Sequence, residues 1–351
     1  MSHLSLLALA HARRGRGRLP PSGRHGIPDL RRIGSLVGDD LRRLEDLIDE
    51  QLRSEIPLIA EVGRYLAGAG GKRLRPALLL LSARLSGHRG EHAIVLAAAV
   101  ELVHAASLLH DDVVDHAASR HHQPSVNSRW GNEFSVLFGD LLYTKSIAMA
   151  LSQDNPRILR LLSDAIGTMV EGEIMEIDRC GDLRVTHEEY LQIVRRKTAV
   201  LFSACLGIGG ILGDVDEPRQ HALAGYGMNL GICFQIGDDL LDFTAKEEVL
   251  GKPVASDLRE GKLTLPAILT LRRGGRAARE KLELVLEDRG FARVRPDEIV
   301  RMARDCGALE ETRALAGRYA EAARRALRPF PRSRYREALE TLADSVQTRD
   351  H

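Results

Sequence analysis

Two stretches of the sequence carry closely spaced carboxylates, each at the end of an apolar run. Both have the spacing Asp-Asp-x-x-Asp, and their members are Asp111, Asp112, Asp115, Asp238, Asp239 and Asp242. This spacing places the first and last carboxylate of each motif on one face of a helix, about one turn apart. Carboxylates crowded on an apolar face repel one another and lose hydration, so either their pKa values rise or hard cations neutralise them. Mg²⁺ fits best because it prefers oxygen ligands, keeps several waters and bridges to substrate phosphates.

One motif of this kind, found alone, would favour a solvated helix end. Two copies favour a metal site, because each follows an apolar helical stretch and is itself followed by a basic segment punctuated by Gly or Pro. These basic segments cover residues 120–127 and 251–262.

A third segment, GGKRLRP at residues 70–76, is a turn that leads into an apolar helix. Pro76 suits the first helical turn, and free backbone N–H groups there, with Lys72, Arg73 and Arg75, would receive a diphosphate. Alone, the segment is equally consistent with a loop of solvated cations. With the acidic motifs, it predicts two anions held differently, one through metal and one through basic side chains. A metal-clamped diphosphate is a better leaving group, whereas one held by Lys and Arg is bound without being ionised.

The elements that position these groups are expected to be helices. Apolar residues recur at intervals of three and four along segments such as 41–56, 93–109 and 134–151, with Gly, Pro and Asn breakers between such runs. No convincing alternating strand pattern is present. We therefore predict an all-α protein in which residues 36–351 form a single-domain helical bundle of about ten or more helices. Residues 1–35 contain seven arginines and one aspartate, which predicts a flexible basic tail.

The composition excludes several other classes of protein. Fifty basic and forty-nine acidic residues leave a net charge of +1, so no overall field favours nucleic acid or an anionic membrane. The four cysteines form no CxxC pair, which argues against a zinc site or a disulfide framework. The apolar stretch at residues 4–10 fits neither a signal peptide nor a membrane span, so we expect a cytoplasmic protein.

From about Leu41 to its C-terminal helices, the chain resembles the trans-type polyprenyl diphosphate synthases. The resemblance rests on five motifs in the family's order: GGKRLRP (70–76), ELVHAASLLHDDVVD (101–115), RKT (196–198), FQIGDDLLD (234–242) and GKPVASDLREGK (251–262). It implies a homodimeric helical bundle around a deep central cavity, with the two acidic motifs facing each other across its mouth.

The resemblance also implies roles for individual side chains. The six aspartates of the two motifs would hold a cluster of roughly three Mg²⁺ ions on an allylic diphosphate. That diphosphate would also contact Arg120, Lys197, Lys252 and Lys262. Isopentenyl diphosphate would contact Lys72, Arg75 and His104. The path of the carbocation would be lined by Thr198 and Gln235.

The implied reaction begins with ionisation of the allylic C–O bond. The isopentenyl double bond then attacks the carbocation, a proton is lost, and repetition lengthens the chain. A carbocation requires a dry cavity lined by apolar groups and helix dipoles, which an all-α bundle supplies.

One departure from the family pattern follows Arg120, where His121-His122 replaces the usual Arg-Gly. Arginine is always charged and can bind in a fork, whereas histidine does neither at neutral pH. We therefore expect weaker or pH-dependent binding of isopentenyl diphosphate.

The residues that precede the first acidic motif predict the product length. The resemblance implies that bulky aromatic side chains at these positions would form a floor that stops growth at short products, but the chain has Ala106, Ser107 and, further back, Val103. From His92 to Asp111 a helix would span roughly 28 Å, which is deep enough for some five or six isoprene units. We therefore expect a long-chain product of about C30 to C50.

The sequence leaves other functions open. These are a shorter-chain geranylgeranyl or farnesyl diphosphate synthase, a class I terpene cyclase, a non-catalytic subunit of a heteromeric synthase, and a helical scaffold with a charged surface. Lys72, Arg75 and His104 argue against the cyclase, which needs no acceptor diphosphate, and His121 argues weakly for it. Both acidic motifs are complete, which argues against the non-catalytic subunit. Neither the allylic primer nor the pathway, whether quinone, carotenoid or another, follows from the sequence.

Two further carboxylates, Glu173 and Glu176, lie four and seven residues after Met169 in an apolar helical run. Their side chains would either face the cavity or belong to a solvated helix face, and we favour the solvated face.

Overall fold

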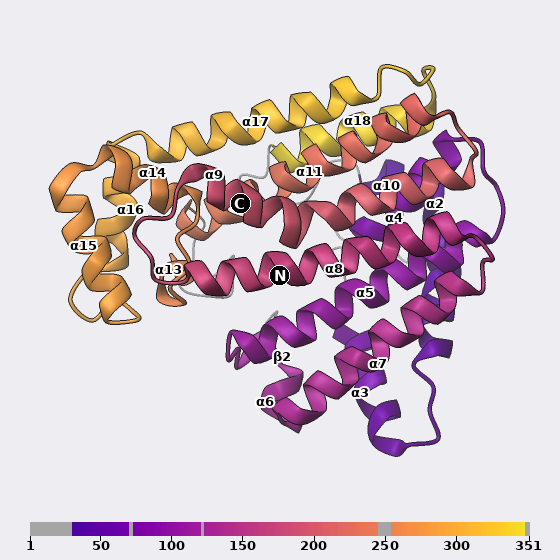
Figure 1. Ribbon diagram of the computed structural model, residues 1–351, viewed down its shortest axis with the longest axis horizontal. Helices are drawn as coiled ribbons and strands as arrows, with labels where there is room; N and C mark the ends of the chain where they lie inside the picture. Colours follow the sequence, from indigo (N-terminus) through magenta and orange to yellow (C-terminus); the bar gives the residue numbers. More distant parts are fainter. Residues whose placement is uncertain (1–29, 70–72, 121–122, 245–253, 348–351) are drawn as a thin grey trace, which may run out of the picture. The chain divides into compact units, whose positions relative to one another are not determined.

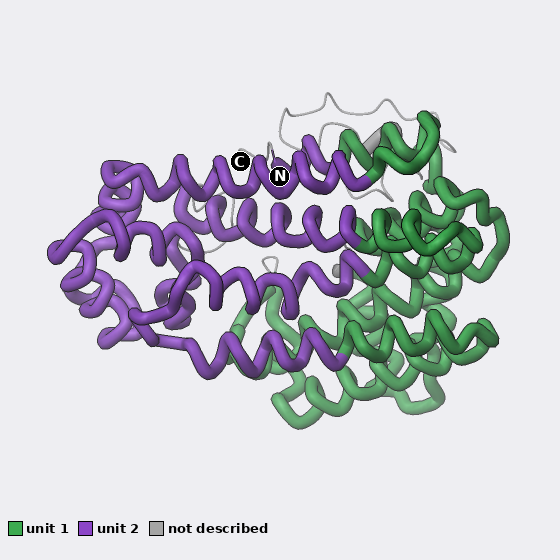
Figure 2. Tube along the Cα trace, turned by 45° about the horizontal axis from the view of Figure 1, so that its top comes forward, with its two compact units in different colours: residues 1–166, 204–224, 327–342 green, residues 167–203, 225–326, 343–351 purple. Residues whose placement is uncertain are grey.

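The chain folds almost entirely into helices (Figure 1), which confirms the predicted all-α class. The computed structural model describes residues 30–69, 73–120, 123–244 and 254–347. Two compact units divide the chain (Figure 2). Unit 1 contains residues 1–166, 204–224 and 327–342, and unit 2 contains residues 167–203, 225–326 and 343–351.

Unit 1 begins with α2, whose first residue, Leu30, lies inside the range 1–35 that we predicted as a tail. The elements that lie wholly in unit 1 are α2 (Leu30–Gln51), α3 (Pro57–Ala69), α4 (Leu74–Leu85), α5 (His92–Val114), β1 (Ser119–Arg120), β2 (Gln123–Pro124), α6 (Val126–Trp130) and α7 (Asn132–Leu151).

Unit 2 contains a π-helical turn, η1, among its helices. The elements that lie wholly in unit 2 are α9 (His187–Val194), η1 (Arg195–Ala199), α13 (Ser256–Arg259), α14 (Leu265–Arg273), α15 (Gly275–Glu287), α16 (Pro296–Asp305) and α17 (Ala308–Ala326). In the described part of the chain, four more helices contribute residues to both units: α8 (Pro156–Arg179), α10 (Val200–Leu212), α11 (Glu217–Thr244) and α18 (Arg334–Gln347).

Helix α5 carries the first acidic motif at its C-terminal end. It packs against α2, α4 and α7, and every residue from 93 to 103 except Val95 is buried. The small alanine side chains at 97–99 allow these neighbours to approach α5 closely. Burial becomes mixed from His104 onward, so the motif lies where the helix leaves the core.

Among the described residues, two helices are long and apolar enough to cross a membrane, judged by length and composition. These are α5 and α7, and 67% of the apolar window of α5 is buried inside the protein, against 39% for α7. The burial of α5 is that of a core helix.

The sequence predicted neither the small hairpin nor the π-helical turn. In the hairpin, Ser119 pairs with Pro124 and Arg120 with Gln123, directly after the first acidic motif. Strands of two residues are too short to show an alternating pattern. A π-helical turn adds one residue to a helical turn, which apolar spacing does not reveal.

Candidate active site

A pocket in unit 2 gathers side chains from α8, α9, η1, α11 and the segment that leads into α14. It brings together five of the predicted site residues, which are Lys197, Thr198, Gln235, Asp239 and Lys262. Apolar side chains of Val185, Ile193, Val194 and Leu263 complete part of the wall. The pocket thus combines cations, one carboxylate of the second acidic motif and an apolar lining.

Asp239 is the most enclosed carboxylate of this pocket, with an exposed fraction of 2%. Its Oδ2 accepts a hydrogen bond from the Tyr190 hydroxyl at 2.6 Å, and its Oδ1 accepts one from Gln235 Nε2 at 2.8 Å. Gln235 Oε1 in turn accepts from the Thr198 hydroxyl at 2.9 Å. Burial, and then the charge of Asp257, raises the pKa of Asp239 well above its usual range.

The surroundings of Asp239 fit a hard cation. A group that loses hydration beside another carboxylate is stabilised in its charged form by a positive neighbour. Within the described residues, no three His, Cys, Asp or Glu side chains gather closely enough to hold an ion by themselves. A divalent cation bound beside Asp239 would therefore take part of its coordination from water or a bound ligand.

Sequence reasoning missed Tyr190, which is 5% exposed and lies on α9. The only signal in the sequence was its place six residues before the RKT motif, because the burial that makes a hydrogen-bond partner necessary is a tertiary feature. Burial raises the pKa of Tyr190 well above its usual range, so the hydroxyl stays protonated and donates. Tyr190 is therefore a positioning residue for the Asp239 carboxylate.

Tyr190→Phe should lower kcat for prenyl transfer by about ten-fold, because it removes the hydrogen bond that orients the Asp239 carboxylate, which contributes roughly 1.4 kcal/mol. Because the ring remains and only the hydroxyl is lost, the protein should stay folded. Steady-state kinetics with a Mg²⁺ titration would measure the effect, and the Mg²⁺ concentration for half-maximal rate should rise. Tyr319→Phe, on α17, is the matched control. Equal kinetics for the two variants would contradict the positioning role.

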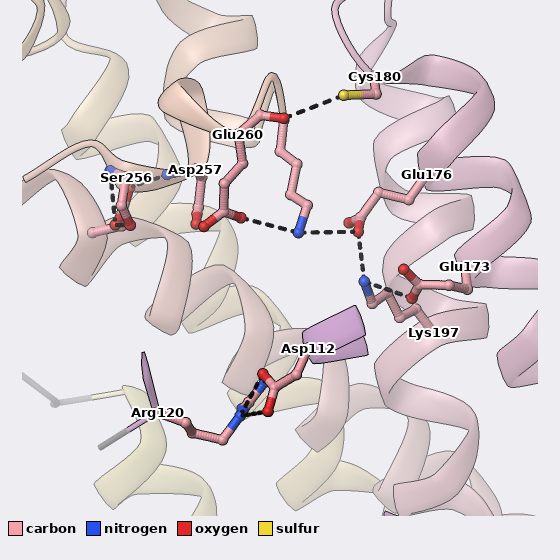
Figure 3. A network of polar contacts seen from close by, with 11 residues as sticks. Asp112, Arg120, Glu173, Glu176, Cys180, Lys197, Ser256, Asp257 and Glu260 are labelled. Carbon is pink, nitrogen blue, oxygen red and sulfur yellow. Dashed lines mark hydrogen bonds and ion pairs between the residues drawn. The ribbon is translucent and has the colours of Figure 1, made fainter. Parts of the chain in front are cut away.

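Lys197 and Thr198 reach the pocket from the π-helical turn η1. Helix α8 lies directly against this turn at Gly172, where an added Cβ would be 2.5 Å from the backbone nitrogen of Lys197. Only glycine allows this approach. It places two carboxylates of α8 on the Lys197 ammonium, Glu173 at 2.6 Å and Glu176 at 2.5 Å (Figure 3).

Our preferred interpretation of Glu173 and Glu176 as a solvated surface was wrong. Their side chains are 17% and 23% exposed, and both pair with Lys197. The apolar pattern of α8 places them on a definite face but does not identify the cation opposite, because η1 is brought there by the tertiary fold.

Lys262 lies on the same side of the pocket as Glu176. Its Nζ is 3.1 Å from Glu260 Oε2 and 3.8 Å from Glu176 Oε2. The Cys180 thiol donates to the Glu260 carbonyl at 3.3 Å (Figure 3), and the Gly181 N–H donates to the Gly261 carbonyl at 2.8 Å. The segment that carries Lys262 is thus fastened to the end of α8.

Asp242, the last carboxylate of the second motif, is 2% exposed and caps α13. One of its oxygens accepts from the hydroxyl and N–H of Ser256, at 2.7 and 3.2 Å, and the other from the Asp257 N–H at 3.3 Å. The structure therefore gives Asp242 a capping role that the sequence did not predict. Metal binding by Asp242 remains a prediction.

The first acidic motif belongs to unit 1. Asp112 is 3% exposed and pairs with Arg120, whose Nη2 and Nε lie 2.7 and 3.0 Å from Asp112 Oδ1 (Figure 3). Asn127 Nδ2 donates to the Asp112 carbonyl at 3.0 Å. Asp111 and Asp115 are half-buried at the end of α5. Arg120, predicted to hold a diphosphate, thus also orients a carboxylate of the motif.

The segment predicted to bind the second anion also lies in unit 1. Lys72 lies outside the described residues, as do Lys252 and His121-His122. Burial, and then the charges of Arg75 and Arg120, holds the pKa of His104 well below its usual range. His104 is therefore neutral, and the positive potential that keeps it neutral would also attract an anion.

Arg73 has a structural role that the sequence did not predict. It precedes α4 with a left-handed backbone conformation, φ 49°. Its guanidinium, 11% exposed, binds Glu101 at 2.6 Å and Glu45 in a fork at 2.5 and 3.1 Å. Three helices meet through these contacts, α2, α4 and α5, so Arg73 anchors the turn that carries Arg75.

Glu101→Gln should lower the free energy of unfolding by about 2 kcal/mol, because a buried charged hydrogen bond is lost beside a fixed guanidinium. Urea denaturation followed by circular dichroism would measure this. Glu91→Gln is the control, since Glu91 pairs with Arg43 and is 67% exposed, where loss of a pair costs at most about 0.5 kcal/mol. Similar values for both variants would rule out the anchoring role.

The chain, almost entirely helical where it is described, matches solved polyprenyl synthase structures, so its fold is that of the isoprenoid synthases. The polyprenyl synthetase profile matches residues 56–301, and the chain belongs to this family. Octaprenyl diphosphate synthase of Escherichia coli is 37% identical over 322 residues, which cover 92% of this chain and 99% of that protein.

Solved structures agree with this assignment. A polyprenyl synthase of Caulobacter crescentus, crystallised with calcium and isoprenyl diphosphate, superposes with a TM-score of 0.87 at 37% identity, covering 94% of this chain and 100% of that one. A decaprenyl diphosphate synthase of Rhodobacter capsulatus superposes with a TM-score of 0.86 at 39% identity, covering 91% and 99%.

Proposed function

We propose that the protein is a trans-prenyltransferase that condenses isopentenyl diphosphate, head to tail, with an allylic diphosphate and releases a long-chain polyprenyl diphosphate. The observation that carries the proposal is the pocket of unit 2, where Lys197 and Lys262 lie beside Asp239 of the second acidic motif. The octaprenyl and decaprenyl synthases among its relatives support a long product, about C30 to C50 by helix length.

Mg²⁺ is the proposed cofactor, as a cluster of roughly three ions held with the substrate phosphates. Asp238 and Asp239 of one motif and Asp111, Asp112 and Asp115 of the other have the donor chemistry for it. When bound, the ions would neutralise the allylic diphosphate and make it a better leaving group.

The side chains of the pocket each have a proposed task. Lys197 and Lys262 hold the allylic diphosphate, and Tyr190 and Gln235 orient the Asp239 carboxylate beside it. The bond from the Thr198 hydroxyl fixes the Gln235 amide, whose dipole then lies where positive charge develops on the allyl group. Apolar wall residues such as Ile193 and Val194 exclude water that would quench the carbocation.

Isopentenyl diphosphate would bind in unit 1 through Arg75 and His104, together with Lys72. The His104 ring is neutral and can donate one N–H to a phosphate oxygen without adding charge. Holding the acceptor without metal leaves its diphosphate intact, as elongation requires.

We further propose that the protein is a cytoplasmic homodimer. On α8, Val170, Ile174 and Ile177 lie on one helix face and are 48%, 60% and 52% exposed. Exposed apolar side chains in one stripe favour cover by a second copy of the chain. A long polyprenyl product is insoluble in water, so its release would involve transient contact with a membrane.

Incubation of the purified chain with labelled isopentenyl diphosphate, Mg²⁺ and geranyl, farnesyl or geranylgeranyl diphosphate tests the proposal. We expect the label to be incorporated into a polyprenyl diphosphate with at least one of these primers, with one dominant product length of about C30 to C50. A cyclised hydrocarbon formed without isopentenyl diphosphate would identify a terpene cyclase instead. Inactivity of the chain alone would indicate a subunit that needs a partner. Light scattering during size exclusion would measure the oligomeric state.

A further inference from the structure

The ammonium group of Lys197 is shared by two carboxylates. Glu173 and Glu176 lie one turn apart on α8 and approach it to 2.6 and 2.5 Å (Figure 3). All three side chains are at most 23% exposed. Solvent and salt therefore screen these charges less than they screen a surface pair.

Lys262 belongs to the same charge cluster. It lies between Glu260, at 3.1 Å, and Glu176, at 3.8 Å, so Glu176 serves both lysines. Around the two ammonium groups, three carboxylates from the described residues outnumber the two positive charges. Arg179, which also lines the pocket, is itself paired with Asp178 and Glu189, so an anion that approaches the two lysines without a counterion meets net negative charge.

The proposed substrate group is itself a multiply charged anion. A diphosphate that binds Lys197 and Lys262 must take the place of Glu173 and Glu176 or share the lysines with them. Either arrangement brings like charges together in a partly buried site, which is unfavourable. Divalent cations bound with the diphosphate remove this repulsion and make the interaction favourable, because the carboxylates then face a cluster whose negative charge is neutralised.

Resting on the proposed function, we infer that Glu173 and Glu176 make diphosphate binding at Lys197 and Lys262 conditional on divalent metal. In this role they prevent the two lysines from holding a bare diphosphate, whether substrate or released product. The pair acts through the lysines, so both glutamates are positioning residues rather than catalytic ones.

If the same contacts had a different role, removal of the carboxylates would change the affinity for diphosphate in the opposite direction. If the carboxylates only kept two flexible lysine side chains in place, their removal would weaken diphosphate binding, with or without metal. The cost of ordering a lysine is limited, whereas two full charges beside a polyanion act directly on its affinity. Electrostatic exclusion should therefore dominate.

The test is isothermal titration of inorganic diphosphate into the wild type, Glu173→Gln, Glu176→Gln and the double variant, in EDTA and again in Mg²⁺. Glutamine keeps the shape and hydrogen-bonding capacity but removes the charge. In EDTA the double variant should bind at least about ten-fold more tightly than wild type, and each single variant should carry part of that gain. In Mg²⁺ the affinity of the double variant for diphosphate should be unchanged or lower. The ratio of its affinity in Mg²⁺ to its affinity in EDTA should therefore be smaller than that of the wild type.

Glu171→Gln is the matched control, because Glu171 lies on the same helix, is 70% exposed and faces Arg196 at 3.8 Å rather than Lys197. It should leave both affinities unchanged. Metal-free binding that is equal or weaker in the double variant, or in the folded single variants should the double fail to fold, would overturn the inference. A wild type that neither binds diphosphate in Mg²⁺ nor elongates labelled primer would refute the proposed function itself.

Discussion

Asp239→Asn should lower kcat/KM for prenyl transfer by about 10³-fold, at the upper end of what one electrostatic contact contributes in a dry site. The change removes the charge that would attract metal and keeps the size of the side chain. It also creates a local conflict, because the Asn amide must point an N–H₂ group at either the Tyr190 hydroxyl or Gln235 Nε2, both of which donate to Asp239. Steady-state kinetics at saturating Mg²⁺ measures the loss.

The control for this substitution is Asp297→Asn on α16, where the carboxylate is 59% exposed and pairs with Arg301. It should leave kcat/KM within about two-fold of wild type, as surface substitutions do. Circular dichroism and urea denaturation distinguish lost chemistry from lost structure. A folded Asp239→Asn protein that retains more than about a tenth of the wild-type kcat/KM would show that this carboxylate is not required.

Much of the framework was predictable because it depends on local pattern. The apolar periodicity predicted the helices, and the second Asp-Asp-x-x-Asp motif contributes Asp239 to the pocket. Five predicted residues, Lys197, Thr198, Gln235, Asp239 and Lys262, line one pocket although they come from three separate segments of the chain. The resemblance to the family supplied the roles proposed for these residues, since helical spacing alone relates residues only within one element.

The partners of these residues were not predictable, because they depend on tertiary contacts. Lys197 meets Glu173 and Glu176 only because Gly172 allows α8 to lie against the π-helical turn. Arg73 was interpreted as a diphosphate ligand, since its neighbours in sequence are cations. Its carboxylate partners, Glu45 and Glu101, come from two other helices.

The capping role of Asp242 also depends on a tertiary contact that spacing in the sequence does not predict. Spacing within Asp-Asp-x-x-Asp treats the last carboxylate as equivalent to the first, because both lie on one helix face. In the fold, Asp242 instead accepts three hydrogen bonds from Ser256 and Asp257. One motif thus combines a pocket-lining carboxylate, Asp239, with one that holds the segment leading to Lys262.

The largest expected change in product concerns α5. Ala106 and Val103 are fully buried, whereas Ser107 is half-buried with its hydroxyl donating to the His104 carbonyl at 2.9 Å. Ala106 precedes Asp111 by five residues, or about 7.5 Å along the helix, so a ring there would meet a growing chain soon after its diphosphate end. Ala106→Phe should therefore shorten the dominant product from the C30 to C50 range to about C15 to C20.

Chain-length analysis of labelled product after phosphatase treatment measures this change. Because Ala106 is fully buried, Phe will also cost about 1–3 kcal/mol of stability by overpacking. Ser107→Phe supplies a second ring at a position with more room, and Ser107→Ala is its matched control, since it removes the hydroxyl without adding bulk. If both rings shorten the product and Ser107→Ala does not, this face of α5 is the wall that the chain grows along. Unchanged length in two folded phenylalanine variants would place the tail against other helices.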